Sequence, residues 1–201
     1  MTSPIRVGYF LEDIAHAEFV TAVVHRVAEG LRLSVTDDVR NASGGRGRVL
    51  HELRNYLRDM CAGRIETAPL VVVAIDGNCS SWHERRRKIS AIAASAEYHG
   101  TVVCAVPNPH IEAWYLADLD AFRTALPGSN PPQLPSRKCE PGFYKNALRD
   151  AIRSSGVIPQ LGGAEYARDI VARMCFERAA RRDPAFGSFL RDLAAALRAC
   201  C

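Results

Sequence analysis

Four short apolar runs, rich in β-branched residues, alternate with amphipathic segments in the first half of the chain. They are RVGYFL (6–11), LRLSVT (31–36), PLVVVAI (69–75) and TVVCAVP (101–107). Runs with apolar residues on both sides are typical of strands covered on both faces. Because helical segments separate them, the order predicts an α/β fold: a four-stranded parallel sheet with helices on both faces and right-handed crossovers.

Three segments between the runs place apolar residues at spacings of three and four, which is typical of helices with one buried face. They cover residues 14–29, 49–62 and roughly 82–99. A glycine follows each predicted helix, at positions 30, 63 and 100. Glycine is common just past a helix C-terminus, so we expect these three helices to stop there.

The strand pattern stops at about residue 109, and helical patterns take its place. The segment HIEAWYLADLDAFRTAL (110–126) predicts one helix, and a proline-rich connection follows it. Further helices are predicted at 143–155, 164–180 and 184–199. We therefore expect an α/β domain over residues 1–118 and an α-helical extension over residues 119–201 that packs on the same domain.

The composition indicates a soluble globular protein. Hydrophobic residues make up 48% and charged residues 24% of the 201 residues. No apolar run approaches the roughly 20 residues that a membrane span requires. The start, MTSPIRVGYFLED, lacks the pattern of a signal peptide, since its apolar stretch is short and acids follow at once. We expect a cytoplasmic protein without a membrane partner.

The cysteines give no sign of a disulfide framework or a zinc site. There are seven, an odd number, scattered along the chain without a CxxC pair. We expect most of them to be reduced core residues. Cys200 and Cys201 are expected to form a reactive tail at the end of the last helix, with no assigned role.

Acidic residues follow the predicted strands. They are Glu12 and Asp13 after the first, Asp37 and Asp38 after the second, Asp76 after the third, and Glu112 soon after the fourth. In open parallel sheets, ligands bind at the carboxyl ends of the strands. Carboxylates that converge there call for a hard divalent cation with oxygen ligands, and Mg²⁺ fits that description. Such an ion can activate a water and stabilise charge on a phosphoryl group.

Basic residues supply candidate phosphate contacts, because the guanidinium group is a planar, two-pronged donor. The net charge is only +4, but arginine and lysine gather in GGRGR (44–48), HERRRK (83–88) and ERAARR (177–182). The candidates for nucleic-acid contact are Arg46, Arg48, Arg85, Arg86, Arg87 and Lys88. The alternative for each group is a solvated helix face, and we prefer that interpretation for the last group.

Other catalytic motifs are missing from the sequence. It has no P-loop, no GxGxxG after the first run, no GxSxG and no HExxH. A small-molecule phosphotransferase is therefore a weaker hypothesis, because the sequence lacks a glycine-rich nucleotide-binding motif. The segment NASGGRGR (41–48) is expected to be a flexible loop. The six histidines show no spacing of a metal-ligand pair, so we expect most of them at the surface.

Several motifs together resemble the Toprim family of topoisomerases, primases and OLD-family nucleases. They are FLED and AIDGN at the ends of the first and third runs, LEDIAHAEFV at the first helix, and AVPNPHIEAWYLAD after the fourth run. The last two are similar to motifs of small bacterial Toprim-like proteins of the RloB and OLD-associated type. The resemblance covers about 120 residues by motif, and it implies a Toprim-like (Rossmannoid) arrangement of the sheet.

The resemblance assigns roles to individual residues. Glu12 matches the family's metal-binding or acid/base glutamate, and Asp76 the first aspartate of its Asp-x-Asp turn. Asn78 stands at the second aspartate, Glu112 matches the acid of the IExW motif, and Glu18 the second acid of the opening motif. The chain departs from the pattern twice, with Asp13 for a glycine and Asn78 for a carboxylate. An asparagine oxygen can still bind Mg²⁺, but it brings no charge.

Two functions follow as hypotheses. The first is a Mg²⁺- or Mn²⁺-dependent Toprim-type nuclease or nuclease-like subunit, with Glu12, Asp76 and Glu112 as catalytic residues and Glu12, Asp76, Asn78 and Glu112 as metal ligands. The resemblance implies anti-phage defence beside an ABC-type, OLD-like ATPase. The second is a catalytically degenerate module that binds or senses nucleic acid or regulates such an ATPase, as Asn78 suggests. Taken singly, Glu12 and Asp13 could merely cap the first helix, since aspartate is a good N-cap residue, and Asp76 could merely form an Asx turn with Gly77.

Overall fold

The structure, a computed structural model, describes residues 3–41, 46–135 and 138–200. The strands are β1 (Ile5–Leu11), β2 (Val35–Asn41), β3 (Leu70–Ala74) and β4 (Thr101–Ala105). The helices between them are α1 (Ile14–Gly30), α2 (Arg46–Cys61) and α3 (Trp82–Ser95). All four strands are parallel, in the order β2-β1-β3-β4. The predicted α/β fold is confirmed, with the parallel arrangement typical of Rossmann-like proteins.

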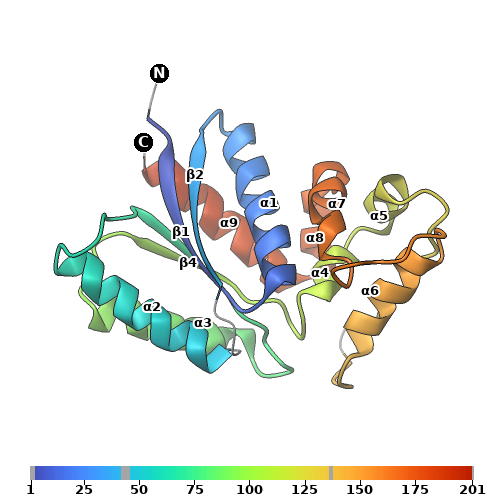
Figure 1. Cartoon of the computed structure of the whole chain (residues 1–201), viewed down its shortest axis with the longest axis horizontal. Helices are drawn as coiled ribbons and strands as arrows, with labels where there is room; N and C mark the ends of the chain where they lie inside the picture. Colours follow the sequence, from blue (N-terminus) through green and yellow to red (C-terminus); the bar gives the residue numbers. More distant parts are fainter. Residues whose placement is uncertain (1–2, 42–45, 136–137, 201) are drawn as a thin grey trace.

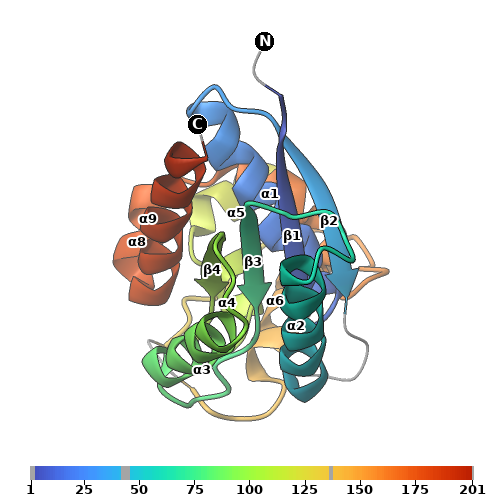
Figure 2. The same ribbon diagram turned by 90° about the vertical axis from the view of Figure 1, so that its left-hand side faces the viewer.

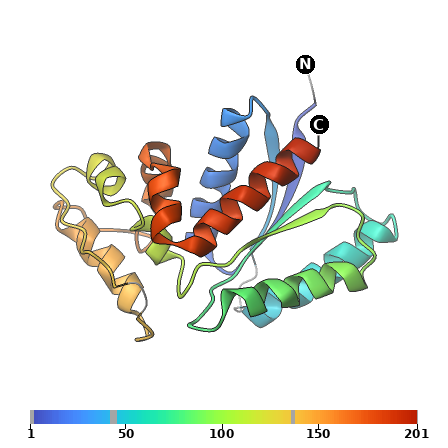
Figure 3. The ribbon, with the colours of Figure 1, turned by 180° about the vertical axis from the view of Figure 1, so that it is seen from behind.

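The sheet separates two layers of helices. Helices α2 and α3 lie on one face, and α1 lies on the other together with the long C-terminal helix α9 (Pro184–Ala199) (Figures 1 and 3). Alternate strand residues point to opposite layers: Tyr9 and Val72 pack beside α1, whereas Phe10 and Val73 pack against α2 and α3. In β1 and β3 both sets are buried, because helices cover both faces of the sheet.

The second strand lies four residues later than predicted. The segment 31–34 continues the end of α1, where the amide of Leu33 donates to the carbonyl of Ala28 and Arg32 has a φ of +59°. That residue, rather than Gly30, takes the left-handed conformation after the helix. Asp37 and Asp38 consequently lie within β2, opposite Val7 and Gly8, and not at its carboxyl end. An edge strand with one neighbour (Figure 2) tolerates such polar side chains.

The extension contains more breaks than its sequence pattern predicts. Its elements are α4 (Glu112–Tyr115), α5 (Leu119–Ala125), α6 (Phe143–Arg153), a 3₁₀ turn η1 (Ala164–Tyr166), α7 (Ala167–Arg173), α8 (Phe176–Arg182) and α9. The predicted helix 110–126 is divided at Asp118, which caps α5 by accepting from the amide of Ala121. The predicted helix 164–180 is divided at Met174 and Cys175, whose backbone is extended. Asp118 also accepts from the Cys175 amide at 2.7 Å, so one buried carboxylate stabilises both breaks.

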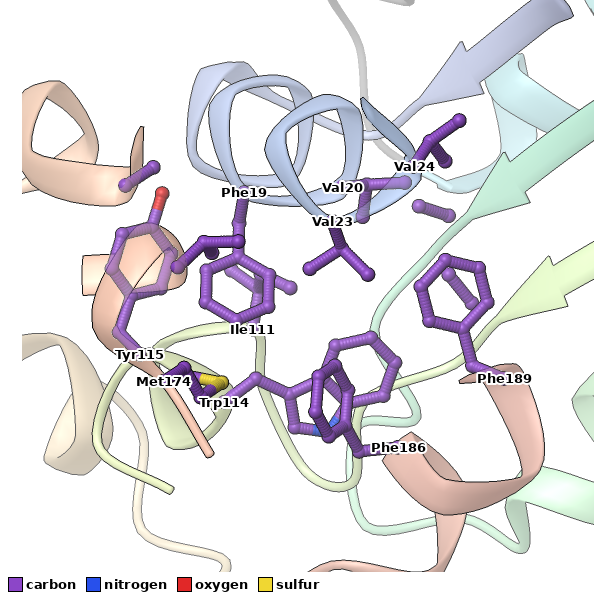
Figure 4. Close-up of a cluster of buried hydrophobic side chains, with 14 of the residues drawn as sticks. Phe19, Val20, Val23, Val24, Ile111, Trp114, Tyr115, Met174, Phe186 and Phe189 are labelled. Atoms are coloured by element: carbon purple, nitrogen blue, oxygen red, sulfur yellow. The ribbon is translucent and has the colours of Figure 1, made fainter. Parts of the chain in front are cut away.

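An aromatic cluster joins the extension to the sheet domain (Figure 4). The rings of Phe19 from α1 and Tyr115 from α4 lie 4.7 Å apart, and Trp114 lies 4.9 Å from Phe186 of α9. All four side chains are fully buried. The indole nitrogen of Trp114 donates to Asp183 at 3.0 Å. The helices after residue 118 therefore share the core of the sheet domain, and the cluster fixes α4 beside the carboxyl ends of the strands.

The cysteines follow the prediction only in part. Cys79 and Cys139 form a disulfide across 60 residues of sequence, which joins the β3–α3 turn to the proline-rich connection. Of the free cysteines in the described residues, Cys104 is buried, whereas Cys61 and Cys175 are exposed. Most of the described cysteines lie outside this disulfide, as expected, but the expectation of core positions is wrong for Cys61 and Cys175. The Cys79–Cys139 pairing was not predicted, because the fold and not the sequence spacing brings these two residues together. Among the described residues, no helix is long and apolar enough to cross a membrane.

Candidate metal centre

Two predicted residues meet where β1 and β3 end. The strands are direct neighbours, with Leu11 opposite Ala74, and the amide of Glu12 donates to the carbonyl of Ala74. The chain leaves β1 toward β2 on one side and returns to β3 on the other, which makes this point the topological switch of the sheet. The amide of Asp76 donates to Glu12 Oε2 at 2.9 Å. The structure therefore brings Glu12 and Asp76 together, as parallel pairing predicts.

A third side chain, His16, enters from the first turn of α1. Asp13 caps this helix by accepting from the His16 amide, and its Oδ1 lies 2.8 Å from Nδ1 of the imidazole. The ring is completely buried, and Nε2 lies 3.1 Å from Asp76 Oδ1. That distance is within ion-pair range, but Nε2 is not aligned for a hydrogen bond with Asp76 and has no other partner. The expectation of a surface position is wrong for this histidine.

The three side chains could together hold a metal ion. One ligand atom from each of Glu12, His16 and Asp76 lies within 4.8 Å of the others. Carboxylate oxygens and an imidazole nitrogen are both common ligands of divalent metals in proteins. No other such group of His, Cys, Asp or Glu occurs within residues 3–41, 46–135 and 138–200. The fit rests on the donor atoms and on the unpartnered, buried nitrogen of His16.

The carboxylates around His16 control its charge. Burial alone would lower the pKa of His16, but the hydrogen bond to Asp13 and the interaction with Asp76 outweigh it and raise the pKa to about 10. Burial acts to raise the pKa of Asp13, and His16 reverses this effect and lowers it to about 2. With no metal bound, a protonated His16 therefore supplies the positive charge that these acids require.

Asp76 is held on its other side by the segment before α4. His110 Nδ1 lies 2.7 Å from Asp76 Oδ2, and the amide of Ile111 donates to Oδ1 at 2.9 Å. Burial would raise the pKa of Asp76, but the hydrogen bond with His110 and the nearby imidazole of His16 lower it below its usual range. The same contact with Asp76 raises the pKa of His110. Asp76 is therefore an ionised, oriented carboxylate.

The β3–α3 turn is fixed against the β4–α4 segment by backbone bonds. Gly77 donates to the carbonyl of Pro107 at 2.8 Å, and Asn78 donates to the carbonyl of Pro109 at 3.0 Å. An Asx turn between Asp76 and Gly77 does not form, because both groups bond to this other segment. A Cβ at position 77 would lie 2.9 Å from the Pro107 oxygen, so the close approach requires glycine.

The remaining predicted site residues lie at the margin of the Glu12–His16–Asp76 group. Asn78 is exposed, with a φ of +48°. Glu112 is half-buried at the start of α4; burial raises its pKa, and the charges of Asp76 and Asp13 act in the same direction. Glu18 is half-buried on α1, two residues after His16. None of these is one of the three closely spaced ligands, so the metal role of Asn78 and Glu112 stays a prediction.

The predicted phosphate contacts on α3 divide into two kinds. Arg86 is a structural residue, because its guanidinium donates to Ser188 and Asp192 of α9 and lies over the ring of Trp82. Arg85 is half-buried and donates to Ser80 at 3.0 Å. Arg87 and Lys88 are exposed. Arg87 and Lys88 are therefore the two that face solvent, and nucleic-acid contact by the four basic residues stays a prediction.

The other two candidates lie at the start of α2. Arg48 is exposed and pairs with Glu52 one turn later, with Nε 2.8 Å from the carboxylate. Arg46 begins α2, and its side chain lies outside the described residues, as does most of the glycine-rich loop. Arg48 therefore faces solvent, whereas the prediction for Arg46 stays untested.

The sequence contained a signal for the missing ligand. In LEDIAHAEFV, a helix-capping aspartate stands three residues before a histidine, and residues at this spacing lie on the same side of the first turn. The histidine spacings give no such signal, because the other two members of the group are carboxylates, Glu12 and Asp76.

The fold and this cluster define an α/β protein with a parallel sheet and a candidate metal centre of two carboxylates and a histidine. Residues 11–194 match the family model described as "Domain of unknown function (DUF4276)", and the chain belongs to that family. The match includes the whole cluster and most of the extension. No curated protein and no solved structure matches the chain.

Proposed function

We propose that this protein is a metal-dependent phosphodiester hydrolase that acts on nucleic acid, a Toprim-type nuclease or nuclease-like subunit. The observation that carries the proposal is the convergence of Glu12 and Asp76, with His16, at the carboxyl ends of two adjacent parallel strands. A divalent cation, Mg²⁺ or Mn²⁺, would there activate a water and neutralise charge on the phosphoryl group. The resemblance of FLED, AIDGN and the IExW motif to Toprim proteins supports the same reaction class.

The chain's own residues then have distinct tasks. Glu12 and Asp76 hold the cation, and the Asp76 amide keeps the Glu12 carboxylate in place. His110 is bonded to Asp76 through Nδ1 and is only partly covered, with 26% of its side chain exposed. Its other ring nitrogen, Nε2, can therefore exchange a proton with a substrate or water beside the centre. Glu112 lies close enough to influence that exchange through its charge.

The substrate and setting are part of the proposal. The exposed cations Arg48, Arg87 and Lys88 are the contacts we propose for the phosphates of DNA or RNA. The resemblance to OLD-associated proteins supports a cytoplasmic role in anti-phage defence, beside an ABC-type, OLD-like ATPase. Fold alone does not fix these points, so they rest on that resemblance.

A nicking assay tests the proposal. Supercoiled plasmid and end-labelled RNA are incubated with the full chain and Mg²⁺ or Mn²⁺, with EDTA as the blank. Glu12→Ala and Asp76→Ala should each abolish cleavage. Glu66→Ala is the matched control, because Glu66 is an exposed carboxylate that precedes β3, at the opposite end of that strand from Asp76, and it should retain full activity. Full activity in both site variants would exclude this centre.

A second function is supported by the charges in the cluster. His16 and His110 both lie within ion-pair distance of Asp76, and the position of the family's second aspartate holds the neutral, exposed Asn78. These features suit a degenerate module that binds nucleic acid or regulates an ATPase without catalysis. It predicts no effect of Mg²⁺ or Mn²⁺ on the melting temperature. If the centre does bind a metal, an ion at 100 times its dissociation constant should stabilise the fold by about 2.7 kcal/mol.

A further inference from the structure

The buried imidazole of His16 is held from one side only. Asp13 Oδ1 lies 2.8 Å from Nδ1, whereas Nε2 has no hydrogen-bond partner although it is completely buried. A buried polar atom without a partner is unusual in a folded protein. Asp76 Oδ1 lies 3.1 Å from Nε2. The carboxylate of Glu12 belongs to the same group of three closely spaced ligand atoms. The nitrogen therefore faces the candidate centre.

This arrangement matches the way proteins orient a metal-binding histidine. Such a residue commonly gives the proton of its other ring nitrogen to a carboxylate, which fixes the tautomer and strengthens the ligand. When Nδ1–H bonds to Asp13, Nε2 presents its lone pair toward Glu12 and Asp76. Two adjacent ligands of an octahedral ion, each at roughly 2.1 Å, lie about 3 Å apart. The 3.1 Å between His16 Nε2 and Asp76 Oδ1 agrees with that separation.

We propose that His16 Nε2 is the third ligand of the centre, that Asp13 positions its ring, and that the site consequently prefers a transition-metal ion such as Mn²⁺ over Mg²⁺. This inference rests on the metal centre in the proposed function. Imidazole suits transition ions, whereas Mg²⁺ selects oxygen ligands and retains its waters. His16 thus supplies the ligand that the exposed Asn78 does not supply. This explains both departures from the Toprim pattern, since Asp13 positions the histidine that replaces the carboxylate missing at position 78.

Metal binding can be measured without any enzymatic activity. Calorimetric titration of the full chain with MnCl₂ and MgCl₂ gives the two affinities, and pulsed electron paramagnetic resonance of bound Mn²⁺ detects coupling to a ligand ¹⁴N. We expect Mn²⁺ to bind at least about tenfold more tightly than Mg²⁺, with a clear ¹⁴N signal. His16→Gln should remove that signal and weaken Mn²⁺ binding more than tenfold, with little change for Mg²⁺.

Asp13 can be tested separately from its capping role. Serine caps helices as well as aspartate does but is too short to reach the imidazole, so Asp13→Ser should preserve the fold and lower Mn²⁺ affinity about 10- to 100-fold. The matched control is His25→Gln, which removes another histidine paired with an aspartate, His25 Nε2 to Asp37 at 2.6 Å, outside the centre. It should change neither affinity. Circular dichroism checks that each variant is folded. If His16→Gln does not fold, His16→Asn replaces it in the same measurements.

The outcomes distinguish this inference from the proposed function. Bound Mn²⁺ without ¹⁴N coupling, or equal affinities for Mn²⁺ and Mg²⁺ that His16→Gln leaves unchanged, would overturn it. If the protein cleaves nucleic acid but its bound Mn²⁺ shows no ¹⁴N coupling, the proposed nuclease function stands and His16 is not a metal ligand. If His16→Gln removes the ¹⁴N coupling but the protein cleaves no nucleic acid, His16 is a metal ligand and the proposed nuclease function is rejected.

Discussion

Replacing Asp118 with alanine should lower the free energy of unfolding by about 3 kcal/mol. The carboxylate is completely buried between α5 and α8. It accepts from the amide of Ala121 at the start of α5, from the amide of Cys175 at 2.7 Å, and twice from the guanidinium of Arg178 at 2.9 Å.

The magnitude follows from the partners that lose their acceptor. Loss of a helix N-cap costs about 1 kcal/mol. An amide left without an acceptor, as at Cys175, costs about 1–3 kcal/mol. Arg178 adds little, because 47% of its side chain is exposed and water can replace the carboxylate. For a domain of this size, about 3 kcal/mol corresponds to a fall in melting temperature of about 6–12 °C.

Asp120 provides the matched control within the same turn. It also pairs with Arg178, at 3.2 Å, but 68% of its side chain is exposed. Asp120→Ala should therefore cost less than about 1 kcal/mol. Denaturant titration and thermal melts of the two variants measure the difference. Equal losses, or a loss below about 1 kcal/mol for Asp118→Ala, would refute the argument from burial.

The effect of pH on this contact has a definite sign. Burial raises the pKa of Asp118, but the hydrogen bonds from Arg178, Cys175 and Ala121 outweigh it and hold the pKa below its usual range. The unfolded chain therefore binds the proton first as the pH falls. The stabilisation is complete above the unfolded pKa of about 4 and is lost as the pH falls through the lower, folded pKa. The difference between wild type and Asp118→Ala should be constant near neutral pH and decrease only below about pH 4.

Two further predictions concern the turns beside the centre. Reduction of the Cys79–Cys139 disulfide, or Cys139→Ser, should cost about 4 kcal/mol, because the bridge closes a loop of 60 residues in the unfolded chain. Denaturant titration with and without reductant measures this loss. Cys61→Ser, which changes an exposed free thiol, is the control. An unfolding midpoint that is the same with and without reductant contradicts the pairing. Gly77→Ala should cost about 1–3 kcal/mol and weaken Mn²⁺ binding, since its Cβ would lie 2.9 Å from the Pro107 oxygen. Gly47→Ala, with open space around it, should change stability by less than about 1 kcal/mol, and similar melting temperatures for the two glycine variants would refute the close approach.

The sequence by itself determined the architecture and one part of the centre. Alternation of apolar runs and amphipathic segments is a local property, and it predicted the parallel sheet and helices α1 to α3. Because the carboxyl ends of parallel strands share one edge, the acids after the first and third runs predicted that Glu12 and Asp76 meet. The cap of α1 by Asp13 was also accessible, since it involves residues only three positions apart.

Only the tertiary structure decided where the chain deviates from its local patterns. The apolar run 31–36 predicted a strand, but β2 begins at Val35, since residues 31–34 complete the turn after α1 and an edge strand accommodates Asp37 and Asp38. Asp118 divides two predicted helices through contacts with a segment 57 residues away.

The burial of His16 was decided in the same way. An amphipathic pattern cannot show that a histidine on α1 is enclosed by carboxylates, because Asp76 comes from another strand 60 positions later in the chain. The disulfide between Cys79 and Cys139 likewise depends on two turns that only the folded chain brings together. Local periodicity thus fixed the elements, whereas the approach of Asp76 to His16 and the Cys79–Cys139 bridge came from contacts between residues distant in sequence.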